Sequence, residues 1–132
     1  LGMQMLLDES DEFEVTKGLG LISGRVEKFP EVKEKDDYIK IPQVNWHEII
    51  PGTSSISWKN SLLKEHMSED SLYFVHSFVA RPSNEHHILA NYNCYGIKIP
   101  ALIIKDNIIG CQFHPEKSGD AGLKILKNFM SM

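Results

Sequence analysis

A histidine and a glutamate stand two residues apart in the segment GCQFHPEKS, residues 110–118. In an extended chain, residues i and i+2 point to the same side, so His114 and Glu116 can face one pocket. A carboxylate that orients an imidazole ring gives a general base its tautomer and its direction. The spacing therefore predicts an acid–base pair with His114 as the base. It leaves the nucleophile unidentified.

The elements around this pair are expected to be a strand before it and a helix after it. Asp106-Asn107 is a turn signal between two apolar runs and predicts a hairpin, whose second strand, residues 108–113, leads into His114. Ser118-Gly119-Asp120 can cap a closing helix at residues 121–130. The apolar stripe expected on that helix consists of Leu123, Leu126, Phe129 and Met130.

The rest of the chain predicts one opening helix and many short strands. Residues 1–14 begin with helix formers and fade in an acidic stretch, and residues 72–80 are the strongest strand candidate. Pro42 demotes residues 38–50 to an edge or bulged strand. Further strands are expected at 21–29, 88–92, 95–100 and 101–105, and a short helix at 61–66 with Leu62 and Leu63 facing inward. This order is α+β, or what an α/β domain would retain without its first half.

Composition excludes several classes of function. The 132 residues fit one domain, and 42% hydrophobic with 24% charged residues is ordinary for a globular protein. A net charge of -4 without a basic block argues against nucleic-acid binding. Residues 31–37 carry charges of both signs and predict a solvated loop. No apolar run approaches the roughly 20 residues of a membrane span.

The metal-ligating and thiol side chains predict no metal site. Cys94 and Cys111 lack CxxC spacing and are expected to be reduced thiols in a cytosolic protein. The adjacent pair His86-His87 does not share a face of a helix or strand, and no further ligand spacing accompanies it.

Four segments besides the closing helix carry a family resemblance in the right order. They are LGMQ at residues 1–4, GLGLISGRVEKF at 18–29, YFVHSF at 73–78 and GCQFHPEKS at 110–118. The chain resembles the class I (triad-type) glutamine amidotransferases, most closely the glutaminase subunits of imidazole glycerol phosphate synthases. The resemblance implies an α/β fold, a flavodoxin-like three-layer domain. Residues 1–132 would be a single partial domain, its strand-rich C-terminal portion with a helix at each end.

The resemblance also implies the roles of individual residues. His114 would be the general base and Glu116 would orient it, while the nucleophilic cysteine would stand immediately before Leu1. The backbone N–H of Leu1 would then be an oxyanion-hole donor. Gln4, Ser77 and Phe78 would bind glutamine, although Phe78 stands where the family often has tyrosine. The resemblance implies no cofactor and no metal, and the chain by itself would be inactive.

The implied partner is a barrel-type cyclase or synthase subunit that receives ammonia, with Tyr73, Lys117 and Trp46 facing it. The parent enzyme would hydrolyse glutamine to glutamate for histidine biosynthesis in the cytoplasm. PQVNW at residues 42–46 departs from the family's Pro-His-Met-Gly-Trp. This departure leaves open a paralogous subunit that serves a surface-sugar amidotransferase.

Three other expectations remain open. One is a non-catalytic binding module. A second is a hydrolase that uses Cys111, which is disfavoured because an odd offset on a strand points that thiol away from His114. The third is that a domain cut through its sheet would expose strand edges and would therefore associate with itself.

Overall fold

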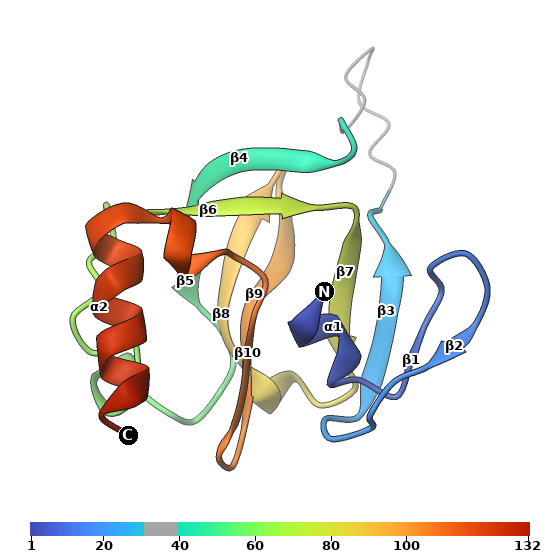
Figure 1. The fold of residues 1–132 in the computed structure, drawn as a ribbon, viewed down its shortest axis with the longest axis horizontal. Helices are drawn as coiled ribbons and strands as arrows, with labels where there is room; N and C mark the ends of the chain where they lie inside the picture. Colours follow the sequence, from blue (N-terminus) through green and yellow to red (C-terminus); the bar gives the residue numbers. More distant parts are fainter. Residues whose placement is uncertain (31–39) are drawn as a thin grey trace.

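A computed structural model describes residues 1–30 and 40–132 of the chain. Strands fill the middle of the chain and a helix lies near each end (Figure 1), as predicted. The elements are α1 (Gly2–Met5), β1 (Glu9–Ser10), β2 (Thr16–Lys17), β3 (Gly24–Lys28), β4 (Gln43–Glu48), β5 (Ile50–Pro51), η1 (Trp58–Asn60), β6 (Ser71–His76), β7 (Phe78–Pro82), η2 (Glu85–His87), β8 (Ile88–Cys94), β9 (Ile97–Lys105), β10 (Ile108–Cys111), η3 (Pro115–Lys117) and α2 (Gly119–Met130). The charged segment 31–37, expected to be a loop, lies outside the described residues.

The described strands form three small sheets. Their orders are β2-β1-β3-β7, β10-β9-β8-β5 and β4-β6, and every pair is antiparallel except β1 with β3. Strand β4 begins directly after Pro42 and pairs only with β6 within the described part of the chain. This confirms the prediction that Pro42 interrupts its segment and leaves an edge strand.

Helix α1 is only four residues long, much shorter than predicted. The carbonyl of Leu6 accepts hydrogen bonds from the N–H groups of Leu21 and Ile22 at 2.9 and 3.0 Å. The Leu7 carbonyl accepts one from Gly20 at 3.0 Å. Because these carbonyls bond to a later segment instead of to a next helical turn, the helix ends and the chain continues as β1.

The continuous strand predicted for residues 72–80 is wrong. The chain bends at Ser77 into two strands, β6 and β7, which belong to different sheets and run in different directions in Figure 1. Across the bend, the His76 ring donates from Nδ1 to the Phe78 carbonyl oxygen at 2.7 Å. The bend therefore has a specific internal bond, and it places the Phe78 carbonyl at the junction of two sheets.

Two tight turns organise the β10-β9-β8-β5 sheet. The hairpin predicted at Asp106-Asn107 is confirmed, because Lys105 pairs with Ile108 across it and Asp106 has a positive φ of 54°. The separate strands predicted at 95–100 and 101–105 are instead one strand, β9. Tyr95 and Gly96 form a second turn with φ values of 49° and 79°, joining β8 to β9.

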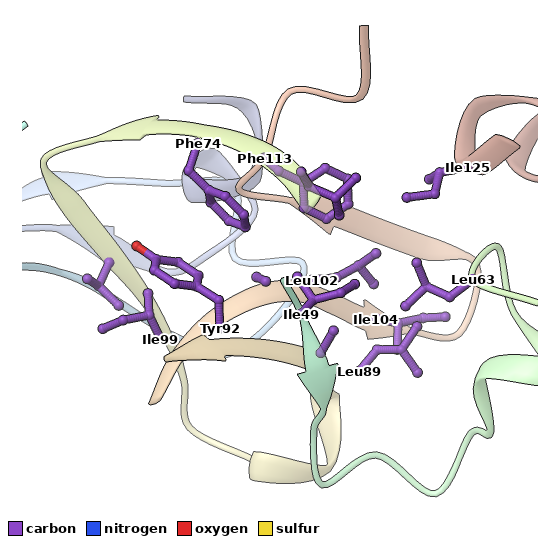
Figure 2. Close-up of a cluster of buried hydrophobic side chains, with 14 of the residues drawn as sticks. Ile49, Leu63, Phe74, Leu89, Tyr92, Ile99, Leu102, Ile104, Phe113 and Ile125 are labelled. Carbon is purple, nitrogen blue, oxygen red and sulfur yellow. The ribbon is translucent and has the colours of Figure 1, made fainter. Parts of the chain in front are cut away.

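The main core lies between β6, the β8–β9–β10 sheet and helix α2. Phe74 and Tyr92 pack with ring centroids 4.4 Å apart, and Phe113 lies 5.8 Å from Phe74 (Figure 2). A second cluster under α1 and β3 contains Met3, Leu7, Ile22, Val26, Ala80 and Ile103. The segment that carries His114 leaves β10 through Phe113, so the main core anchors it from one side.

Helix α2 presents a different face to the core from the one predicted. Its buried residues are Gly122, Ile125 and Asn128, whereas Leu123 and Phe129 are about half exposed, at 49% and 51%. Asn128 is buried because its side-chain amide donates to the Leu62 carbonyl at 3.1 Å. The predicted helix at 61–66 is a turn that follows η1, but Leu62 and Leu63 are buried as expected.

Candidate active site

The His114–Glu116 contact predicted from spacing is present. His114 Nδ1 lies 2.8 Å from Glu116 Oε1, and both side chains are partly exposed. The route to this contact differs from the prediction, since only His114 is extended, with φ −100° and ψ 96°, and Glu116 lies in the 3-10 helix η3. A tight turn, and not strand alternation, brings the carboxylate back to the ring.

The protonation pattern of the pair follows from its geometry. The hydrogen bond from His114 lowers the pKa of the Glu116 carboxyl below its ordinary value, so this group is an anion at neutral pH. A carboxylate only accepts hydrogen bonds, and Nδ1 must therefore carry the proton. When the ring carries that one proton, Nε2 keeps its lone pair and is the atom that a general base uses.

Three side chains predicted to face a partner gather beside His114. The Trp46 and Tyr73 rings meet edge to face with centroids 5.6 Å apart, and Lys117 Nζ lies 5.9 Å from the Tyr73 ring centroid. The Tyr73 ring is 6.4 Å from that of His114. Trp46 is 50% exposed, so this cluster forms surface next to the acid–base pair.

Gln4, predicted to bind substrate, is fixed by two hydrogen bonds. Its Nε2 donates to the Phe78 carbonyl and to Gln112 Oε1, both at 3.2 Å. Because the amide N–H groups are used within the protein, Gln4 Oε1 is left to accept a bond from a ligand. Gln112 is buried and two residues from His114, and sequence reasoning gave it no role even though it lies within GCQFHPEKS.

A pocket of about 360 Å³ opens beside Gln4, between α1 and the β1–β2 hairpin. Leu1 and Glu12 also line it, and Leu1 is 80% exposed. Of the neighbouring carboxylates, Glu9 and Asp11 pair with Arg25 at 2.9 and 2.6 Å. Glu12 makes no ion pair among the described residues and remains an available anion. Sequence reasoning missed Glu12. Only the ion pairs with Arg25 distinguish Glu9 and Asp11 from it, and the sequence does not show those pairs.

Ser77 and Phe78 lie at the bend between β6 and β7 and are half-buried. Their backbone carbonyls are engaged: that of Ser77 accepts from the Phe29 N–H at 3.4 Å, and that of Phe78 accepts from Gln4 and from His76. Phe78 thus contacts the candidate site through its backbone, which does not depend on the hydroxyl that a tyrosine would add.

Neither cysteine is suited to be the nucleophile. Burial raises the pKa of Cys111 to about 11, and burial also raises that of Cys94, whose thiol donates to Gln43 Oε1 at 3.7 Å. A nucleophilic cysteine needs the opposite shift, toward the thiolate.

The residues that the structure describes hold no cluster of three or more His, Cys, Asp or Glu side chains that could bind a metal. Within residues 1–30 and 40–132, no helix has the length and apolar character needed to cross a membrane.

The whole of this chain, residues 1–132, matches the family "Glutamine amidotransferase class-I". The chain belongs to that family, and the predicted fold class, a strand-rich α/β amidotransferase domain with a helix at each end, is confirmed. That residues 1–132 form a partial, C-terminal domain stays a prediction.

Among its relatives is "Imidazole glycerol phosphate synthase subunit HisH 1" of Legionella pneumophila (strain Lens), 43% identical over 132 residues, which cover 100% of this chain and 62% of the relative. The HisH subunit of Geobacillus sp. (strain WCH70) is 40% identical, with coverage of 100% and 59%. That of Prochlorococcus marinus subsp. pastoris is 42% identical over 130 residues, with coverage of 98% and 58%. The chain spans about three fifths of the length of these curated relatives.

Proposed function

We propose that this chain belongs to a glutaminase that hydrolyses glutamine to glutamate and passes the ammonia to a synthase partner. The observation that carries the proposal is the 2.8 Å bond between His114 Nδ1 and Glu116. It leaves Nε2 as a free base at the end of the segment that also carries Gln112, the buried partner of Gln4. Residues 112–114 therefore connect the proposed base, His114, to Gln4 at the substrate pocket.

The pocket beside Gln4 fits the amino-acid end of glutamine. Gln4 Oε1 is a free acceptor, and Glu12 is the carboxylate there without an ion pair in the described part of the chain. Two acceptors, one of them anionic, match the three donors of an α-ammonium group. Glu12 is therefore proposed as a glutamine-binding residue beside Gln4, with Ser77 and Phe78 contributing backbone groups.

The chemistry needs a thiol that neither Cys94 nor Cys111 supplies. The family resemblance assigns it to a cysteine directly before Leu1, with the Leu1 backbone N–H stabilising the oxyanion. His114 would take the thiol proton as sulfur attacks the amide carbon, and would give that proton to the departing ammonia. Water then hydrolyses the thioester to glutamate and restores the thiol.

The proposed partner surface is the outer face of the β4–β6 sheet. Val44 and Trp46 on β4 pair with Val75 and Tyr73 on β6, and Val44 and Trp46 are 53% and 50% exposed. Lys117 lies against Tyr73 at one side. An apolar centre with a cation at its border is a common composition for a protein interface.

The relatives' names favour an imidazole glycerol phosphate synthase over a surface-sugar enzyme as the assembly. We propose a cytoplasmic heterodimer with a cyclase subunit, acting in histidine biosynthesis.

Glutamate release by the complete protein with its synthase partner tests the proposal. We expect His114→Asn to lower kcat by about 10²- to 10⁴-fold, the usual contribution of a general base. His86→Asn is the matched control, because His86 is exposed and its ring bonds to the Thr53 carbonyl, at 3.0 Å, and not to a residue of the candidate site. Full activity in His114→Asn would contradict the general-base role of His114, and absence of glutamate release by the complete wild-type protein would favour the non-catalytic module. Loss of activity in Cys111→Ser would favour a hydrolase that uses Cys111.

A further inference from the structure

Ser118 occupies the junction between η3 and α2, and its hydroxyl is not used as sequence reasoning predicted. It is 3% exposed and stands at the N-cap position of α2, where a serine normally accepts a bond from the first helical turn. No such capping bond is present at this helix. The expected cap is therefore wrong, and the hydroxyl has other partners.

Those partners are the backbones of His114 and Tyr73. The Ser118 hydroxyl donates to the His114 carbonyl at 2.6 Å and accepts from the Tyr73 N–H at 3.0 Å. The His114 N–H in turn donates to the Tyr73 carbonyl at 2.9 Å. These three bonds close a ring that ties both backbone polar groups of His114 to one residue of β6.

The geometry of the ring shows what its loss would change. The His114 carbonyl also accepts from the Lys117 N–H at 3.0 Å, and the Glu116 carboxylate still reaches the ring of His114. Without the Ser118 hydroxyl, η3 would keep these local bonds and lose one of its two backbone ties to β6. The His114–Glu116 pair would remain assembled but would be held less firmly against β6, through the bond from the His114 N–H to the Tyr73 carbonyl.

Ser118 lies in a closely packed junction. A Cβ on Gly122 would overlap the Pro115 carbonyl oxygen and come within 2.8 Å of Ser118 Cβ. The first turn of α2 therefore lies directly on η3 and beside Ser118.

We propose that Ser118 is a positioning residue, which holds His114 against β6 so that its base nitrogen faces the substrate. This inference rests on the proposed glutaminase function. A displacement of about 1 Å at a reacting group can cost on the order of 10²-fold in rate. None of the Ser118 hydrogen bonds described above involves a residue of the Gln4 pocket. Loss of Ser118 is therefore expected to lower kcat and to leave substrate binding unchanged.

The test is steady-state glutamine hydrolysis by the complete protein with its synthase partner. Ser118→Ala should lower kcat about 10- to 100-fold and leave KM within about twofold, whereas Ser118→Thr, which keeps the hydroxyl, should restore most of the loss. Ser61→Ala is the matched control. Ser61 is 6% exposed and its hydroxyl also makes two bonds, to the Trp58 carbonyl at 2.9 Å and from the Leu63 N–H at 3.0 Å. The Ser61→Ala variant should lose as much thermal stability as Ser118→Ala and should keep the wild-type kcat.

An unchanged kcat in Ser118→Ala, or an equal loss of kcat in Ser61→Ala, would overturn the positioning role. If the threonine variant does not fold, the comparison of the two alanine variants still decides. His114→Asn, measured alongside, separates the two possible failures. Unchanged activity in that variant contradicts the proposed function itself, while its loss together with an unaffected Ser118→Ala contradicts only the inference about Ser118.

Discussion

His76 gives the fold a defined sensitivity to acid. It is 7% exposed, its Nδ1 donates to the Phe78 carbonyl at 2.7 Å, and its Nε2 lies 2.7 Å from the Tyr92 hydroxyl. With the proton on Nδ1, Nε2 accepts the hydrogen of the tyrosine hydroxyl. Burial lowers the pKa of His76 from 6.5 to about 4 and raises that of Tyr92. The ring is therefore neutral in the folded protein.

The size of the effect follows from the separation of the two pKa values. The unfolded chain takes up a proton at His76 below a pH of about 6.5, whereas the folded protein does not until a pH of about 4. Stability is therefore complete above that window and falls as the pH decreases through it. At about 1.36 kcal/mol per pH unit, His76 alone removes about 3 kcal/mol of unfolding free energy between about pH 7.5 and about pH 4.

The assay is urea unfolding of the wild type and of His76→Asn at a series of pH values. Asparagine keeps an N–H for the Phe78 carbonyl, does not titrate, and leaves the buried Tyr92 hydroxyl without an acceptor, at a cost of about 1–3 kcal/mol. The variant should be less stable near neutral pH, and the wild type should lose about 3 kcal/mol relative to it toward about pH 4, which removes or reverses that difference. Comparison with the variant removes the contributions of His47 and His66, whose pKa values burial also lowers. Parallel curves across this range would refute the reasoning.

Three further results are expected. Gln112→Met should raise the KM for glutamine about fivefold with little change in kcat, because the bond that orients Gln4 is worth about 1 kcal/mol; an unchanged KM in steady-state assays would contradict this. Gly122→Ala should lower the thermal midpoint strongly, since the added methyl overlaps the Pro115 carbonyl oxygen, and a wild-type midpoint would show that α2 can move away. Ile125→Ala should cost about 2–5 kcal/mol in urea unfolding and Leu123→Ala less than about 1 kcal/mol, because only Ile125 faces the core; the reverse order would restore the predicted stripe.

Local sequence signals predicted the features that local structure decides. The Asp106-Asn107 turn, the interruption at Pro42 and the closing helix each depend on residues next to one another, and each is present. The bend at Ser77 was not predicted, because two polar residues, His76 and Ser77, do not by themselves end a strand whose apolar residues continue on both sides. The break exists because β6 pairs with β4 and β7 pairs with β3, which are partners distant in sequence.

The buried face of α2 could not be predicted from hydrophobicity for a related reason. Ranking by apolar character selects Leu123 and Phe129 over Gly122 and Asn128. The packing selects Gly122 because the helix approaches a backbone carbonyl closely, and Asn128 because its amide bonds to Leu62. Both causes depend on a neighbouring segment that periodicity does not describe.

The candidate site also combines a local contact, which the sequence predicted, with contacts between distant residues, which it did not predict. The His114–Glu116 contact spans two residues, so its spacing was informative, although a 3-10 turn and not an extended strand produces it. Gln112 bonds to Gln4 across 108 positions, and Ser118 to Tyr73 across 45. Sequence reasoning therefore gave Gln112 no role and gave Ser118 only the role of a helix cap.

The most direct test of the account is a double-mutant cycle on kcat for glutamine hydrolysis, with His114→Asn, Glu116→Gln and the two combined. Glu116 is held to act only through the ring that it orients. We therefore expect Glu116→Gln to lower kcat at least about 10-fold in the wild type and to have almost no further effect once His114 is replaced. If Glu116→Gln lowers kcat by the same factor in both backgrounds, the two residues act independently and the His114–Glu116 pair is not a catalytic unit.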